Sequence, residues 1–361
     1  MQLAPDQLAA HLARGLGSLY VLYGDEPLLI QEAADAIRQA ARTQGYTERS
    51  VHTVSGAYFD WSAVLAASGA MSLFADRQIL ELRMPSGKPG KEGGQALVQL
   101  TQSLQGQDST LALVLLPDLD KATRASAWFS ALQAGGVCLQ IESIDRAALP
   151  RWIAQRLALQ GQRMAAGESG QQALSFFADR VEGNLLAAHQ EIQKLALLYP
   201  AGELSLQQVE SAVLNVARYD VFKLAEAVLA GQALRVQRML DGLRAEGESQ
   251  VLVHWALAEE IRNLKRVKDA IAEGRPLPMA LRENRIWGLK ERLFERVLPH
   301  LPAGTLAHLL DAAHKVDGIC KGLRHPDWPS DSWQALHRLA MQLCEPCAAG
   351  TRPLRGARPA V

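Results

Sequence analysis

The sequence predicts an α/β domain with a parallel sheet, followed by two all-α regions. In residues 1–145, short β-branched or leucine-rich runs alternate with amphipathic stretches, which is typical of strands connected by helices. Several runs are apolar continuously and not alternately, as expected for strands that helices cover on both faces. Beyond residue 145 such runs are absent, and apolar residues recur at helical spacing.

The strand-like and helix-like stretches of the first region alternate along the chain. We expect strands at 18–24, 50–55, 77–84, 109–117 and 136–143. We expect helices at 27–42, 61–71, 95–105 and 121–133. Strands that alternate with helices favour a parallel sheet, so residues 1–145 form the predicted α/β domain.

The second region, residues 146–212, contains no stretch that we interpret as a strand. In the segment 182–200, Leu185, Ala188, Ile192, Leu195 and Tyr199 recur three and four residues apart, which places them on one face of a helix. Pro200 and Gly202 end that helix. We therefore predict a small helical domain.

The third region, residues 213–348, is predicted to be helical throughout. Loops are expected at Gly247 and at 274–278, 301–305 and 324–331, where glycine and proline gather. Residues 349–361 are small, basic and rich in glycine and proline, and we predict a disordered tail. The long apolar stretches 221–230 and 251–261 predict more apolar surface than one layer of helices hides, and therefore a collar that binds other subunits.

Composition restricts the classes of function. The 361 residues contain 38 lysines and arginines and 38 aspartates and glutamates, whereas a protein that wraps DNA carries a positive excess. The N-terminal segment lacks the basic and apolar parts of a signal peptide, and no run of about 18 apolar residues predicts a spanning helix. Four cysteines are too few for a disulfide framework in a chain of this length. We expect a cytoplasmic protein that makes no membrane contact.

The turn after the first predicted strand lies where a nucleotide-binding protein holds phosphate. A working loop reads G-x-x-x-x-G-K-[ST], whereas this chain has Gly24, Asp25, Glu26 and Pro27 and no lysine after them. Two carboxylates repel phosphate, and Pro27 has no amide hydrogen to donate. The fourth strand ends at Asp118 and Asp120 without an adjacent Asp-Glu pair for Mg²⁺. We predict a degenerate loop that neither binds nor hydrolyses ATP, and no cofactor.

The order of these segments resembles the delta-subunit family of bacterial DNA polymerase III clamp loaders. The resemblance extends to about residue 345, and its most specific segments are LYVLYGDEPLLIQEAADAIRQAA, AMSLFADRQILEL and EGNLLAAHQEIQKLALLYP. Weaker matches are AWFSAL, LPRWIAQR and NRIWGLK. The segments 86–94 and 324–331 and the tail depart from the family pattern, so no residue roles are transferred to them.

The resemblance implies an ATPase-type (AAA+-like) domain at 1–145, a helical lid at 146–212 and a collar at 213–348. It implies a non-catalytic subunit of a DNA polymerase holoenzyme that binds the beta sliding clamp and opens the ring for loading on primed DNA. The implied partners are the clamp, the tau/gamma and delta-prime subunits and, through the complex, primed DNA. No arginine follows Gly183 at the start of the lid helix and no Ser-Arg-Cys finger follows the fifth strand, which suits a subunit that does not use ATP.

In this family an adjacent apolar pair between a helix and the third strand inserts into the clamp. The resemblance assigns that role to Leu73 and Phe74, with Met71 and Ser72 beside them. Two such side chains contribute about 1.5–3 kcal/mol each when buried in a partner. The alternative is that both residues cap the core of the α/β domain.

Two further motifs are open to more than one interpretation. Trp287 lies between Arg285 and Lys290 and could stack on an unpaired template base, or it could be a core residue of an amphipathic helix. Trp328 is a weaker candidate for the same contact. Cys344 and Cys347 have the spacing of half a zinc site, but no second pair completes it, so we predict no bound metal.

Two other functions remain open from the residues. One is an active ATPase of the same architecture, either a helicase loader or a catalytic clamp-loader subunit, and the missing lysine after Gly24 argues against it. The other is a stand-alone DNA-binding scaffold, which salt-dependent binding of DNA by the isolated chain would support.

Overall fold

A computed structural model describes residues 1–56, 58–69, 77–214 and 217–349. The chain divides into two compact units, which are described separately below. The sheet unit consists of Met1–Ser175 and Leu185–Ala212, and the helical unit consists of Phe176–Asn184 and the described residues from Val213 onward.

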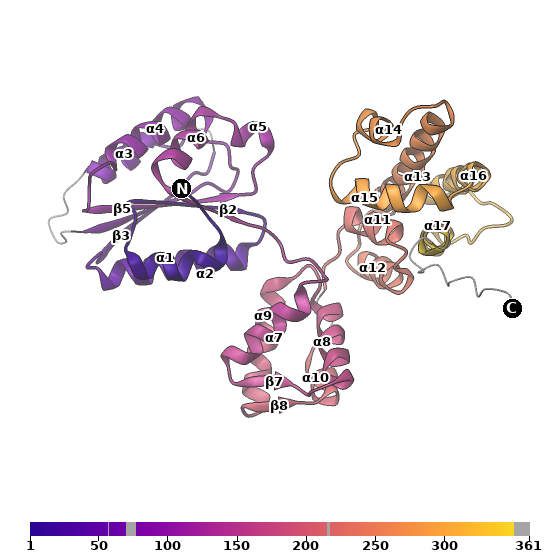
Figure 1. Ribbon diagram of the computed structural model, residues 1–361, viewed down its shortest axis with the longest axis horizontal. Helices are drawn as coiled ribbons and strands as arrows, with labels where there is room; N and C mark the ends of the chain where they lie inside the picture. The colour runs from indigo at the N-terminus through magenta and orange to yellow at the C-terminus, as the bar shows by residue number, and fades with distance from the viewer. Residues whose placement is uncertain (57, 70–76, 215–216, 350–361) are drawn as a thin grey trace, which may run out of the picture. The chain divides into compact units, whose positions relative to one another are not determined.

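The sheet unit is built around a parallel sheet (Figure 1). In the described part of the chain its strand order is β1-β6-β2-β5-β4-β3. The strands are β1 (Gln2–Leu3), β2 (Leu19–Gly24), β3 (Glu48–Thr53), β4 (Gln78–Arg83), β5 (Thr110–Pro117) and β6 (Val137–Ile141). All neighbours pair in parallel, so the predicted fold class of the first region is confirmed.

Helices cover both faces of this sheet, as the continuous apolar strands predict. On one face, helices α1 (Leu8–Arg14) and α2 (Pro27–Thr43) cover Tyr20 and Leu22. On the other face lie α3 (Trp61–Gly69), α4 (Gly90–Ser103) and α6 (Ala127–Gly135), and the short α5 (Lys121–Arg124) precedes α6. The short 3-10 helix η1 (Pro5–Gln7) precedes α1.

Two helices of the sheet unit differ from the prediction. Helix α4 begins at Gly90, inside the glycine-rich segment, and not at residue 95 as predicted. The glycines allow the helix to pack closely against its neighbours, since a Cβ at Gly93 would lie 2.4 Å from the Trp61 ring. The helix predicted at 121–133 is two helices, because the Ser126 side chain accepts a hydrogen bond from the Phe129 amide and caps a new helix there.

The region 146–212 is mainly helical, but the prediction that it lacks strands is wrong. Its helices are α7 (Leu149–Leu159), α8 (Glu168–Val181), α9 (Leu185–Leu198) and α10 (Leu206–Ala212). Strands β7 (Gln162–Met164) and β8 (Gly202–Leu204) pair in parallel. The buried Gln162 amide anchors β7, since it donates to the carbonyls of Leu195 (3.1 Å) and Tyr199 (2.9 Å). Strands of three residues are too short to show a periodic pattern.

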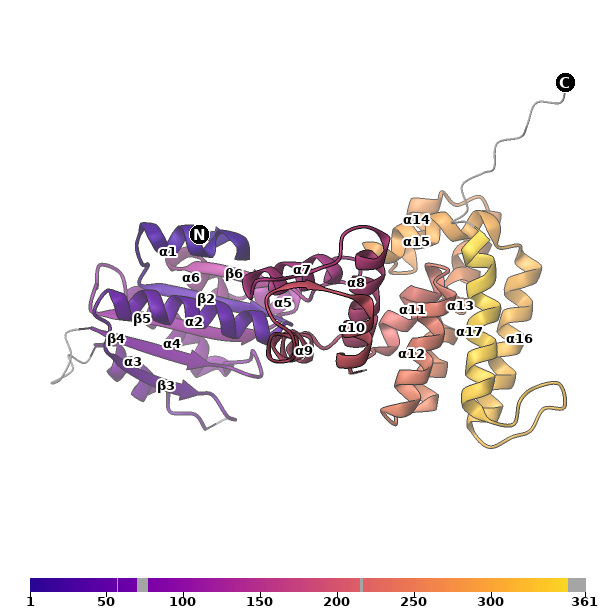
Figure 2. The ribbon, with the colours of Figure 1, turned by 90° about the horizontal axis from the view of Figure 1, so that it is seen from below.

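The helical unit contains helices only, within the residues described, as predicted. They are α11 (Val221–Leu229), α12 (Ala233–Ala245), α13 (Gln250–Ala272), α14 (Leu277–Glu283), α15 (Leu289–Val297), η2 (Leu298–His300), α16 (Ala303–Cys320) and α17 (Ser332–Ala349). Helix α13 packs against α11, α14, α16 and α17 (Figure 2), and its Leu257, Ile261 and Leu264 are fully buried.

Residues 176–184 belong to the helical unit, and ion pairs join them to α12. The Arg235 guanidinium donates to Glu182 Oε1 at 2.5 and 3.0 Å, and Arg238 pairs with Asp179 at 2.9 Å. No helix of the described chain has both the length and the apolar content needed to cross a membrane.

Candidate functional site

The predicted clamp-binding residues Met71, Ser72, Leu73 and Phe74 lie outside the described residues, but both flanks of their segment are described. Helix α3 precedes the segment and β4 follows it. The buried Gln78 amide at the start of β4 donates to the Ala67 carbonyl of α3 (2.7 Å) and to Thr110 Oγ1 (3.3 Å). This contact joins the last turn of α3 to the first residue of β4.

A second contact fixes the β4 side of the same segment. The Arg77 guanidinium donates to the Gln44 carbonyl at 2.8 Å and lies 5.5 Å from the centre of the Tyr46 ring. The Tyr46 hydroxyl in turn donates to the Asp108 carbonyl at 2.9 Å. Arg77 therefore makes contacts within the fold that tie the start of β4 to the end of α2.

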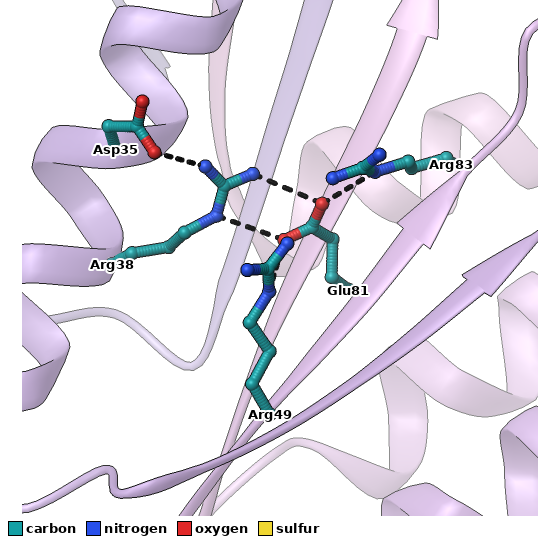
Figure 3. A network of polar contacts seen from close by, with 5 residues as sticks. All are labelled: Asp35, Arg38, Arg49, Glu81 and Arg83. Carbon is teal, nitrogen blue, oxygen red and sulfur yellow. Dashed lines mark hydrogen bonds and ion pairs between the residues drawn. The ribbon is translucent and has the colours of Figure 1, made fainter.

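Farther along β4, a buried carboxylate binds three arginines (Figure 3). The Glu81 side chain is 0% exposed. Arg38 of α2 donates to both of its oxygens, at 3.0 and 3.1 Å, and Arg38 also pairs with Asp35. Arg49 of β3 donates to Glu81 Oε2 at 3.0 Å, and Arg83 donates to Oε1 at 2.7 Å. The Glu81 network therefore joins α2, β3 and β4 beneath one face of the sheet.

The pKa of Glu81 reflects two opposing effects. Burial raises it, but the hydrogen bonds from Arg38 and Arg83 and the charges of Arg38 and Arg49 lower it by more. The result is a pKa below the ordinary value for glutamate, so that Glu81 is ionised at neutral pH.

The turn at Gly24 is shorter than a phosphate-binding loop. Only Asp25 and Glu26 separate the end of β2 from Pro27, the first residue of α2. Gly24 has φ +153°, and a Cβ there would lie 1.7 Å from the Ile141 carbonyl oxygen, so the turn lies directly against β6. Two residues cannot form the ring of amide donors that surrounds a phosphate.

Backbone amides near this turn already donate hydrogen bonds to carboxylates of the protein. Asp25 Oδ1 accepts a hydrogen bond from the Ser143 amide at 2.7 Å, and the Asp25 amide donates to the Ile141 carbonyl at 3.2 Å. Glu26 caps α2 by accepting from the Leu28 amide at 3.4 Å. Burial raises the pKa of Glu26 and outweighs that hydrogen bond, and the charges of Asp25 and Glu32 act in the same direction as burial. The start of α2 thus carries acidic groups where phosphate would need donors.

At the end of the fourth predicted strand, which is β5, Asp120 has a structural role. Its carboxylate caps α5 by accepting from the Thr123 amide at 2.7 Å. The hydrogen bonds with Thr123 lower its pKa. Asp120 is therefore a helix cap, which the Asp-Lys-Ala-Thr sequence could have indicated.

Trp287 is not a core residue of an amphipathic helix. It lies in the connection between α14 and α15 and is 61% exposed. Arg285, in the same connection, is exposed and has φ +58°, which is rare for a residue other than glycine. Lys290, which also flanks Trp287, forms an ion pair with Glu260. Trp287 and Arg285 are therefore both accessible to a partner.

Cys344 and Cys347 are buried in the core of the helical unit. Helix α17 continues through Pro346, and burial raises the thiol pKa to about 11 for Cys344 and about 12 for Cys347. Among the residues that the structure describes, no three His, Cys, Asp or Glu side chains gather where they could hold a metal ion.

Known proteins resemble the chain over most of its length. Residues 20–142 match the family described as DNA polymerase III, delta subunit. The chain is 33% identical over 344 residues to DNA polymerase III subunit delta of Escherichia coli (strain K12), covering 95% of this chain and 96% of that protein. It is 28% identical over 354 residues to the Haemophilus influenzae subunit delta, covering 94% and 98%.

A solved structure, the Bacillus subtilis DNA clamp loader delta protein, has 17% sequence identity and a TM-score of 0.49, covering 94% of this chain and 99% of that one. The predicted family is confirmed by the sequence relatives. Because 33% of residues are identical over nearly the whole of both proteins, this chain belongs to the DNA polymerase III delta-subunit family.

Proposed function

We propose that this chain binds the beta sliding clamp through Leu73 and Phe74, with Met71 and Ser72 beside them, and opens the ring. The observation that carries the proposal is that contacts within the fold fix the residues on either side of this segment. Gln78 joins α3 to β4, and Arg77 joins the start of β4 to the end of α2. The two elements that flank Leu73 and Phe74 in the sequence, α3 and β4, are therefore fixed to each other and to the rest of the sheet unit.

Ring opening requires no chemistry by this subunit. A protein that binds the open ring more tightly than the closed ring shifts the equilibrium toward the open ring, by its difference in affinity for the two states. The partners in this proposal are the clamp, the tau/gamma and delta-prime subunits and primed DNA. The experiment is a titration of the purified chain with beta clamp in the absence of ATP, and a complex is expected to form.

The proposed division of labour places the clamp-binding segment in the α/β part and subunit contacts in the collar. Residues 1–145 would contact the clamp, residues 146–212 would act as the lid, and residues 213–348 would join the sister subunits. The exposed Trp287 and the neighbouring Arg285 are available for stacking on, and pairing with, a template strand held by the whole complex.

The chain is expected to show no specific heat on calorimetric titration with Mg·ATP. The two-residue turn at Gly24 lacks a lysine and consists of Asp25 and Glu26. Their carboxylates already accept hydrogen bonds from the backbone amides of Ser143 and Leu28, respectively. An ATP-binding tau/gamma subunit provides the positive control. A dissociation constant in the micromolar range would contradict the proposal and favour an active ATPase.

An apolar patch on the helical unit is proposed as the contact with sister subunits. Most apolar residues of α11 and α13 face the core, but Phe222, Val251, Leu252 and Trp255 are between 38% and 51% exposed. The Phe222 and Trp255 rings contact each other edge to face, with centroids 6.2 Å apart. Aromatic residues that are exposed together are typical centres of protein interfaces.

Replacing both Phe222 and Trp255 with alanine is expected to weaken assembly with the other loader subunits by about 2 kcal/mol or more, roughly thirtyfold. Clamp binding by the variant should be unchanged, because the change lies in the helical unit. Sizing chromatography of the reconstituted complex measures the first effect and a clamp titration the second. Leu234→Ala removes an exposed leucine of α12 outside the patch and serves as the control. If the double variant assembled with the same affinity as the original chain, the patch would not be the contact with sister subunits.

A further inference from the structure

Helix α7 is joined to α2 by a two-point ion pair within the sheet unit. The Arg156 guanidinium donates through Nη1 to Glu32 Oε1 at 2.6 Å and through Nη2 to Glu32 Oε2 at 2.5 Å. The guanidinium also lies 4.8 Å from the centre of the Trp152 ring, one turn earlier on α7. The Arg156 side chain is thus held on two sides, which favours a fixed orientation.

A second contact joins the same two parts of the unit. The segment from β6 to α7 passes the turn at Gly24, where Asp25 accepts the Ser143 amide at 2.7 Å and donates its own amide to the Ile141 carbonyl. Asp25 lies just before α2 and Glu32 lies in its second turn, so both acidic contacts come from the start of that helix. Helix α9 also packs against α2.

The Asp25 contacts lie where a nucleotide-binding protein of this fold class places phosphate, at the turn between the first long strand and its helix, and the Glu32 contact lies in the second turn of that helix. In such a protein, the ligand supplies negative charge at that turn. Here the negative charge belongs to the protein, in Asp25, Glu26 and Glu32, and Glu32 binds the cationic side chain of the following helical region.

We propose that Glu32 and Arg156, together with Asp25, are positioning residues that hold α7 against α2 in place of a bound nucleotide. The sheet unit then keeps one internal arrangement whether or not ATP is present. This inference rests on the proposed function, in which the subunit acts without ATP, and it adds the residues that make such action feasible.

The test is hydrogen–deuterium exchange of the full chain, followed in peptides that cover residues 149–159. Arg156→Met and Glu32→Met should each accelerate exchange in α7 by roughly fivefold, since partly exposed ion pairs contribute about 1 kcal/mol at most. Arg156→Lys keeps the charge but loses the two-point geometry, and should give an intermediate rate. The double variant Glu32→Arg with Arg156→Glu restores opposite charges and should return the rate toward that of the original chain.

Arg163→Met is the matched control, because it removes a 3.8 Å ion pair with Glu203 in which both side chains are largely exposed. Its α7 peptides should exchange at the original rate. The proposal is overturned if Arg156→Met leaves α7 exchange unchanged, if the charge-swapped variant is no better than the single ones, or if Mg·ATP slows α7 exchange in the original chain. Clamp binding is measured separately, so a chain that never binds the clamp would refute the proposed function while leaving the exchange result intact.

Discussion

Replacing both Leu73 and Phe74 with alanine is expected to weaken clamp binding by about 4 kcal/mol, roughly a thousandfold, because each truncated anchor of an interface costs about 2 kcal/mol or more. The melting temperature should change little, since side chains that insert into a partner contribute little to the core of their own chain. A clamp titration and a thermal melt of the same double variant measure the two effects.

The alternative role of these residues, as a cap on the α/β core, predicts the opposite pair of results. Each core truncation would then cost about 2–5 kcal/mol of stability. Leu65→Ala provides the matched control, because Leu65 of α3 precedes the same segment in the sequence and packs against the core. That control should lower the melting temperature while the folded fraction still binds the clamp. The same behaviour in the Leu73 and Phe74 double variant would rule out the proposed clamp contact.

Replacing Glu81 with glutamine is expected to lower the free energy of unfolding by about 3 kcal/mol at neutral pH. The substitution keeps the size of the side chain but removes the charge that Arg38, Arg49 and Arg83 share and leaves Arg38 only its pair with Asp35, and breaking a buried ion pair typically costs about 3–5 kcal/mol. Denaturant unfolding of both chains gives the difference. Glu48→Gln, at an exposed position of β3, is the control and should stay within about 0.5 kcal/mol.

The contribution of Glu81 to the free energy of unfolding should decrease as the pH falls. Its pKa is lower in the folded chain than the ordinary value of about 4.3, so its contribution is fully present above that value. The contribution is lost as pH falls through the folded pKa, because the unfolded chain takes up the proton first. The difference between the original chain and Glu81→Gln should therefore shrink in acid. A difference that stays constant from neutral pH to about pH 2 would show that Glu81 does not act through its charge.

The strands of the sheet unit were predictable because each is a buried apolar run. The five predicted strands are all present, with ends within two residues of the prediction. Strand β1, with two residues, and strands β7 and β8, with three each, were missed because such short segments lack periodicity. Their positions depend on partners far away in the chain, such as Cys138 for Gln2.

The candidate site was predictable only where its signal is local. The degenerate turn at Gly24 follows from the residues beside it, and its two-residue length agrees with the missing lysine. The Glu81 network could not be predicted, since Arg38 lies 43 residues away and Arg49 lies 32 residues away. The alternation within β4 predicts which face Glu81 occupies but not the arginines that it meets. The pairing of Glu32 with Arg156 could not be predicted from the sequence for the same reason, since the two residues lie 124 positions apart.

The parallel sheet order has a consequence for synthesis of the chain. Strand β2 pairs with β5 and β6, and β1 pairs with β6, so the earliest strands gain their complete neighbours only after residue 117 for β5 and residue 141 for β6 have been made. At roughly 5–20 residues per second, the apolar strand Leu19–Gly24 leaves the ribosome several seconds before its neighbours exist. Pairings of such long range also fold slowly. The nascent sheet unit should therefore depend on chaperones that cover apolar segments, and rapid overexpression should favour aggregation through β2.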